Sequence, residues 1–336
     1  MQRQIAELDE LERIVDAARG RLEASVVAQV ADGERRFPLY ALRLGTSSTQ
    51  APAVGFFAGV HGLERIGTHV VLAFLASLVA RLDRDESFER LLAEVRLVFM
   101  PLINPAGMQR GTRSNANGVD LMRNAPLDSN ERVAFLLGGH RLSRRLPWYR
   151  GDAGAPLEPE SEALCRLVRE ELLSRPLSLA LDCHSGFGLR DRIWFPYAHT
   201  RRPFVHLAEV HALMGLFCES HPRHSYLFEP QSRRYLAHGD LWDYLSAGAS
   251  ANARVFLPLT LEMGSWRWVR KSPRQLLSRL GLFNPLPSAR LERVRSNHLP
   301  WLYFLCHAAR TCRQWLPTGA NRERHDHTGR LQWFAS

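Results

Sequence analysis

The chain has 336 residues, of which 45% are hydrophobic and 23% charged, a composition typical of a globular rather than a disordered protein. No apolar stretch approaches the roughly 20 residues that cross a bilayer, and the N-terminal segment lacks the apolar core of a secretory signal. The five cysteines form no Cys-x-x-Cys pair, which favours reduced thiols in a cytoplasmic protein over disulfides. We therefore expect a cytoplasmic protein without membrane contact.

The formal net charge of +10 rests on 44 basic residues, all of them arginine except Lys271. Such a skew is typical of a compositional bias across a genome as much as of selection for a partner. A basic balance permits binding of nucleic acid or of an acidic substrate, but the arginines are spread over the whole chain. We therefore expect no nucleic-acid partner, and the sequence leaves the oligomeric state open.

Helical and extended patterns alternate along the first part of the chain. In order, we expect a helix over residues 4–19, strands near 23–30, 37–44 and 53–60, a helix over 65–82 and a strand over 94–102. Residues 103–130 are rich in Asn, Gly and Arg and predict a long ordered loop, which in a compact domain is usually functional.

The second part continues with a helix over 158–174 and strands over 177–183 and 254–261. Several strands end in polar residues followed by glycine. This pattern predicts a single α/β domain with a mixed, mostly parallel β-sheet, helices on both faces and a site at the carboxyl ends of the strands. We place the domain over residues 1–316 and expect the polar segment 317–336 to be a flexible tail.

Three candidate metal ligands follow predicted strands. His61 and Glu64 come after the apolar run 53–60, and His184 closes the run 177–183. Zn²⁺ takes nitrogen and oxygen donors in tetrahedral geometry, so these side chains suit a zinc site. Taken alone, the His-x-x-Glu pattern is weak and is better explained by two polar residues of a surface loop.

Glu262 ends another apolar run, where an acid is costly to bury unless it is paired or functional. It is the candidate general base that takes a proton from metal-activated water. Arg113 or Arg123 is a candidate cation for the carbonyl oxygen, the other interpretation being two arginines on a solvated face.

The segment from Asn104 to Asn124, with Asn104-Pro105-Ala-Gly and Arg113-Ser-Asn-Ala-Asn-Gly-Val-Asp-Leu-Met-Arg-Asn, resembles the signature of the M14 zinc carboxypeptidases. The segments Trp148–Gly151 and 157–160 resemble the family's Tyr-Arg-Gly … Glu-Pro-Glu motif. His61-x-x-Glu64, His184-Ser185 and Glu262 follow the family's order, and the resemblance covers about residues 50–265. It implies a zinc carboxypeptidase-like fold.

The resemblance also assigns roles. It implies one zinc ion held by His61, Glu64 and His184, with Glu262 as the general base and Arg113 polarising the scissile carbonyl. Asp120 would hold the second imidazole nitrogen of His61, although an aspartate that follows a glycine also suits a turn. Arg123 would bind the substrate carboxylate. Trp242-Asp-Tyr244 resembles the Trp-x-Tyr of the family's mobile flap, so Tyr244 would contact the substrate.

One position departs from the family pattern. Met122 stands where an asparagine normally helps Arg123 hold a terminal carboxylate, and the loss of such a hydrogen bond costs about 1.5–3 kcal/mol. Met122 can line an apolar pocket instead, or Asn124 can compensate and bind substrate. The requirement for a free carboxylate is therefore left open.

The predicted function is a zinc-dependent amide hydrolase, a metallocarboxypeptidase that removes the C-terminal residue of a peptide. The alternative is an N-acyl amino-acid deacylase related to succinylglutamate desuccinylase and aspartoacylase. A third possibility is a non-catalytic binding protein with the same fold. The expected partner is accordingly a peptide or an N-acyl amino acid.

Overall fold

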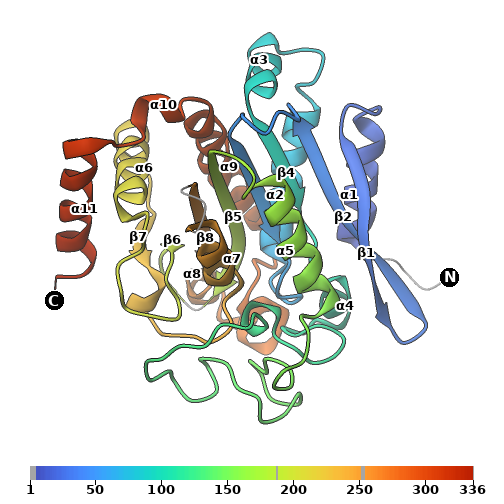
Figure 1. The fold of residues 1–336 in the computed structure, drawn as a ribbon. Helices are drawn as coiled ribbons and strands as arrows, with labels where there is room; N and C mark the ends of the chain where they lie inside the picture. Colours follow the sequence, from blue (N-terminus) through green and yellow to red (C-terminus); the bar gives the residue numbers. More distant parts are fainter. Residues whose placement is uncertain (1–4, 187, 251–253, 336) are drawn as a thin grey trace.

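An eight-stranded mixed β-sheet forms the centre of the protein (Figure 1). The computed structural model describes residues 5–186, 188–250 and 254–335. The sheet order is β1-β2-β4-β3-β5-β8-β6-β7. The strands are β1 (Glu23–Asp32), β2 (Arg35–Gly45), β3 (Ala53–Ala58), β4 (Arg96–Met100), β5 (Leu177–Gly186), β6 (Arg192–Phe195), β7 (Leu227–Pro230) and β8 (Val255–Gly264).

The four middle strands, β4, β3, β5 and β8, run parallel to one another. Every residue of β3 and β4 is buried, as expected for parallel strands that are covered on both faces. Antiparallel pairs occur towards the two edges, between β1, β2 and β4 and between β6 and β8. The carboxyl ends of the four parallel strands therefore meet at one edge of the sheet.

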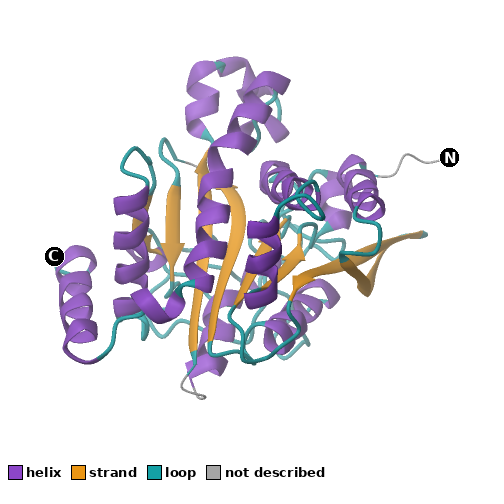
Figure 2. Ribbon diagram, turned by 90° about the horizontal axis from the view of Figure 1, so that it is seen from above, coloured by secondary structure: helices purple, strands orange, loops and turns teal. Residues whose placement is uncertain are grey.

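Helices cover both faces of the sheet (Figure 2). On one face α2 and α9 pack on β3 or β5, and α1 packs on α2, whereas α5 and α7 pack together on the other face. None of the described helices combines the length and the apolarity needed to cross a membrane. The α-helices are α1 (Ala6–Ala17), α2 (Arg65–Val79), α3 (Glu86–Glu94), α4 (Pro105–Arg110), α5 (Pro159–Glu171), α6 (Leu207–Ser220), α7 (Leu241–Ser250), α8 (Trp266–Lys271), α9 (Ser288–Arg310), α10 (Cys312–Trp315) and α11 (Gly319–Trp333).

The predicted α/β architecture is confirmed, but two strands end later in the chain than predicted, closer to the site. The strands β5 and β8 extend to Gly186 and Gly264, so His184 and Glu262 lie within strands and not after them. The predicted loop 103–130 contains two short helices, α4 and the 3₁₀ helix η1 (Leu121–Arg123). The Asn104 side chain accepts a hydrogen bond from Gly107 N and caps α4, and Pro105 suits its first turn. Further 3₁₀ helices are η2 (Gln231–Arg233), η3 (Pro273–Leu277) and η4 (Leu280–Leu282).

The expectation of a flexible C-terminal tail is wrong. Residues Gly319–Trp333 form α11, which packs against α6 beside β7 (Figure 1). Trp333 is buried, and its indole N–H donates to Phe228 O at 2.8 Å. Arg322 donates to the buried Glu209 at 2.7 Å. A helix that is polar over most of its surface is held here by the Trp333 anchor and the Arg322–Glu209 ion pair, which hydrophobic periodicity does not detect.

Candidate active site

Three candidate metal ligands converge at the carboxyl ends of β3 and β5. His61 and Glu64 lie in the turn between β3 and α2, which the hydrogen bond from Glu64 N to His61 O closes at 3.0 Å. Gly62 makes this turn possible, because a Cβ atom there would lie 2.0 Å from the backbone carbon of Gly107. His184 comes from β5. The donor atoms of the three side chains all lie within 4.8 Å of one another.

The ligand triad is buried, with exposed fractions of 3% for His61, 3% for Glu64 and 4% for His184. Glu64 Oε2 accepts from Ser185 N at 3.0 Å and lies 3.2 Å from His184 Nδ1. Burial opposes its ionisation, but the two histidines and Arg113 lower its pKa. Burial lowers the pKa of His61 well below its usual value, which favours the neutral imidazole that binds metals. The triad thus combines an ionised carboxylate with two imidazoles as possible metal ligands.

A buried carboxylate that we did not predict supports His184. Asp182 is fully buried, and its Oδ2 lies 2.8 Å from His184 Nε2 and accepts from Trp242 Nε1 at 2.9 Å. Despite burial, this carboxylate raises the pKa of His184 well above its usual value. The signal was present in the sequence, since residues two apart on a strand face the same side of the sheet. Metal-binding histidines commonly have such a carboxylate on the other ring nitrogen.

Asp120 lies beside His61, as predicted, but without a hydrogen bond between them. Its Oδ1 is 3.8 Å from His61 Nδ1, while its oxygens accept from Arg113 Nε at 2.7 Å and from Met122 N at 3.1 Å. Asp120 therefore caps η1 and holds Arg113. The role of Asp120 towards the imidazole of His61 stays a prediction.

Glu262 lies next to His184, because β5 and β8 pair in register at these two positions. Its carboxylate needs the space beside Gly186, where an added Cβ would lie 2.8 Å from Glu262 Oε2. The side chain is partly exposed to a cavity. Burial, together with the charge of Glu64, raises its pKa to about 7. A carboxyl with this pKa can take up and release a proton near neutral pH.

The cavity has a volume of about 680 Å³, within the range of small-molecule and peptide sites. Its wall includes the three candidate ligands and most of the other side chains that the sequence predicted for the site: His61, Glu64, Arg113, Met122, Arg123, His184 and Glu262. Arg113 Nη1 also lies 3.3 Å from Glu64 Oε1. One concave site therefore contains the candidate ligands, base and cations.

Arg123 is a buried cation without a described carboxylate partner. It is 2% exposed, donates to Met122 O at 3.2 Å and to the Tyr235 hydroxyl at 3.3 Å, and lies 5.7 Å from the Tyr235 ring centre. Its Nε atom has no hydrogen-bond partner in the described part of the chain. The charge of Arg123 lowers the pKa of nearby Asp240, but burial and the charge of Asp243 outweigh it and raise this pKa to about 7. The cavity thus contains an anion-binding group with unused capacity.

Two predicted substrate residues lie outside the cavity wall. Asn124 donates to Arg150 O at 3.1 Å and accepts from Glu158 N at 2.7 Å, so its amide is used to hold two loops together. Tyr244 lies on α7, where its hydroxyl accepts from Arg169 at 3.2 Å. The tyrosine that does line the cavity is Tyr235, which no motif in the sequence identified.

Comparisons with known proteins identify the family of this chain. A family model described as zinc carboxypeptidase matches residues 28–266. The chain is 24% identical over 185 residues to carboxypeptidase D of Anas platyrhynchos, covering 52% of this chain and 11% of that one. It is 28% identical over 157 residues to the carboxypeptidase N catalytic chain of Rattus norvegicus, covering 42% and 33%. The chain thus spans a third or less of the length of these curated relatives.

Solved structures share the fold. Thrombin-activatable fibrinolysis inhibitor is 18% identical with a TM-score of 0.66, covering 90% of this chain and 72% of that one. A carboxypeptidase A from Helicoverpa armigera is 18% identical with the same TM-score of 0.66, covering 92% and 74%. At this level of identity the likeness concerns the fold, and the site rests on the residues described above.

Proposed function

Because this chain belongs to the zinc carboxypeptidase family, we propose that it is a metallocarboxypeptidase that hydrolyses the last amide bond of a peptide. The observation that carries the proposal is Arg123. A buried guanidinium is costly to leave without a counter-charge, and this one shares a cavity with the candidate ligands and Glu262. The carboxylate at the end of a peptide chain supplies the missing charge and places the last amide bond near Glu262.

The ligand triad fits zinc, the metal of this family. Its donors are two imidazoles and one carboxylate, a set that catalytic zinc sites use, and His61 Nδ1 is buried without a hydrogen-bond partner among the described residues. When bound, zinc supplies a positive charge that polarises a carbonyl group and lowers the pKa of water. His61, Glu64 and His184 would hold it, and Asp182 would fix the ring of His184.

The remaining groups divide the reaction among themselves. Arg123, with the Tyr235 hydroxyl, binds the terminal carboxylate and orients the peptide. Arg113 donates an N–H to the carbonyl oxygen, where negative charge develops. The carboxylate of Glu262 accepts the proton of the attacking water and passes it to the leaving nitrogen. Met122 lines the cavity and presents an apolar wall where the family usually has an amide.

The comparisons do not favour the alternative of an N-acyl amino-acid deacylase, since the family and the curated relatives named above are carboxypeptidases. We also propose a cytoplasmic location. All five cysteines are free thiols in the structure, which fits a reducing compartment.

Paired peptides that differ only in a free or an amidated C-terminus test the proposal on the zinc-loaded full chain. We expect release of the terminal residue from the free peptide, and a kcat/KM at least about 30-fold lower for the amidated one, because amidation leaves Arg123 without its charge partner. Equal cleavage of the two peptides would contradict a carboxypeptidase. Cleavage of N-acyl amino acids alone would favour the deacylase.

A further inference from the structure

The charged side chains that line the cavity are mostly arginines. Eight arginines contribute to its wall, whereas the lining carboxylates among the described residues are Glu64 and Glu262. Both of these acids belong to the catalytic centre. Among the described residues, the rest of the lining therefore contains arginines and no further carboxylate.

Four of these arginines, which we call the rim arginines, come from three separate segments. They are Arg144 and Arg145 between η1 and α5, Arg190 between β5 and β6, and Arg279 between η3 and η4. All four are exposed. Within the described parts of the chain, none of their guanidinium groups forms a hydrogen bond or an ion pair. The acid next to Arg190 is not available to it, because Asp191 accepts from Arg267 and from Gly264 N.

Two further lining arginines share one carboxylate. Glu229 on β7 is buried and accepts from Arg192 at 3.0 Å, from Arg234 at 2.6 Å and from the Trp194 indole at 3.2 Å. One negative charge thus serves two guanidiniums. This wall of the cavity keeps a net positive charge even where its arginines are paired.

The depth of Arg123 decides which part of a substrate meets this charge. Arg123 is buried, whereas the rim arginines are exposed. A peptide whose terminal carboxylate reaches Arg123 must leave the cavity past the rim. The side chains that meet the rim are then those on the N-terminal side of the scissile bond, and guanidinium groups pair best with carboxylates in this setting.

We propose, on the basis of the proposed carboxypeptidase activity, that the preferred substrates are acidic peptides with Glu or Asp at the positions preceding the released residue. An acidic peptide suits this surface better than a nucleic acid does, because the unpaired guanidiniums surround the cavity that contains Glu262 and Arg123. The positive field at the rim also speeds the approach of such peptides at low salt.

The test compares two peptides of equal length with the same C-terminal residue, one with three glutamates before it and one with three glutamines. We expect kcat/KM of the zinc-loaded full chain to be about tenfold or more higher for the glutamate peptide at low ionic strength, with a smaller ratio at high salt. The double variant Arg144→Gln/Arg145→Gln should lower that ratio about three- to tenfold, as expected for two exposed ion pairs.

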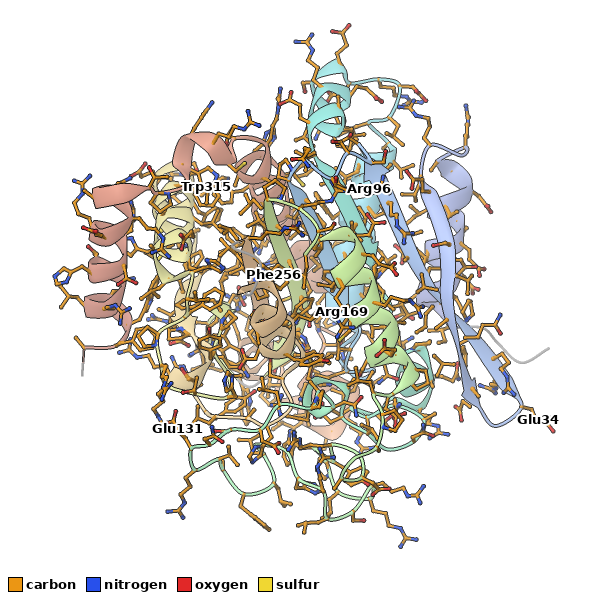
Figure 3. All side chains as sticks on the ribbon, in the orientation of Figure 1. Glu34, Arg96, Glu131, Arg169, Phe256 and Trp315 are labelled. Carbon is orange, nitrogen blue, oxygen red and sulfur yellow. The ribbon has the colours of Figure 1, made fainter. Side chains whose placement is uncertain are left out.

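A charge-matched control separates the rim from the net charge of the chain. Arg313 on α10 and Arg324 on α11 are exposed, and α10, with Trp315 labelled, lies at the opposite end of the molecule from the long loop that carries Glu131 (Figure 3). The variant Arg313→Gln/Arg324→Gln should therefore leave the peptide preference unchanged.

Each remaining outcome has one meaning. Equal cleavage of the two peptides overturns the acidic preference and leaves the carboxypeptidase proposal standing. If neither peptide is cleaved, and peptides with other C-terminal residues also resist, the proposed function itself fails. Stronger inhibition by a single-stranded RNA oligonucleotide than by the amidated glutamate peptide, with the same loss in the rim variant, would assign the rim to nucleic acid and overturn the proposal.

Discussion

Two glutamates in this protein, Glu7 in α1 and Glu262 in β8, have opposite pKa shifts. Glu7 is buried, but Arg65 Nε and Nη2 donate to it at 2.7 and 2.5 Å, and His69 Nε2 lies 3.2 Å away. Burial opposes its ionisation, yet these partners lower its pKa to about 2. Glu262 has no ion-pair partner among the described residues, and burial with the charge of Glu64 raises its pKa to about 7.

The difference separates a structural charge from a functional one. At the contact between α1 and α2, a buried charge is neutralised by partners within the fold and stabilises that contact. At the carboxyl end of the sheet, Glu262 and Arg123 lie beside the cavity without equivalent partners, which costs folding energy. Proteins tolerate such local conflicts at sites where a ligand completes the arrangement.

Removing the ionisable group of Glu262 should have the largest effect. Glu262→Gln keeps the shape of the side chain but cannot accept a proton, so kcat/KM should fall about 10³-fold, the scale of general-base catalysis. Steady-state hydrolysis of a free-terminus peptide measures it. Zinc content and the free energy of unfolding should stay near those of the wild type, and near-normal turnover would show that the base is another group.

Removing the unpaired cation of Arg123 should give the second largest loss of activity. Arg123→Gln should lower kcat/KM for a free-terminus peptide about 100-fold, because the terminal carboxylate loses a buried charge partner. The much slower cleavage of the amidated peptide should hardly change. A similar loss on both peptides would mean that Arg123 supports the fold and not the carboxylate.

The buried acid behind His184 gives a smaller effect on the metal site. Asp182→Asn should weaken zinc binding about 10- to 30-fold. Without the carboxylate, the imidazole of His184 loses the group that orients its ring and raises its basicity. Competition with a chromophoric chelator measures this affinity directly. The surface variant Asp326→Asn on α11 is the control, and unchanged zinc affinity in Asp182→Asn would contradict the role of Asp182.

Substitution of Glu7, the structural glutamate, should change only the pH dependence of the free energy of unfolding. The folded pKa of Glu7 lies below its unfolded value of 4.5, so its contribution is complete above about pH 5 and is lost as pH falls towards 2. When the pH is lowered from 7 to 3.5, protonation of Glu7 alone should lower the free energy of unfolding by about 1.4 kcal/mol. Urea titrations of Glu7→Gln should show a shallower acid limb than the wild type. Glu34→Gln, on the exposed tip of the β1–β2 hairpin (Figure 3), should follow the wild type.

Much of the site was predictable, because adjacent parallel strands bring their carboxyl ends together. His61, Glu64, His184 and Glu262 each follow or end an apolar run in the sequence, and the fold brings them to one cavity. Asp182 was also within reach of sequence reasoning through the alternation of β5. The substrate contacts expected of Asn124 and Tyr244 stay predictions. Both side chains lie outside the cavity wall, because side-chain direction beside a 3₁₀ turn and on a helix is not determined by residue spacing.

By itself, the sequence determined the α/β class through local periodicity, and its motifs, read with the family resemblance, picked out the candidate ligand triad and the candidate base within short segments. Only the tertiary structure decided which charges are neutralised. Tyr235 reaches Arg123 across 112 residues of chain, the rim arginines come from three separate loops, and α11 docks through the buried Trp333. These pairings depend on which distant segments the packed core brings together, and no local pattern contains that information.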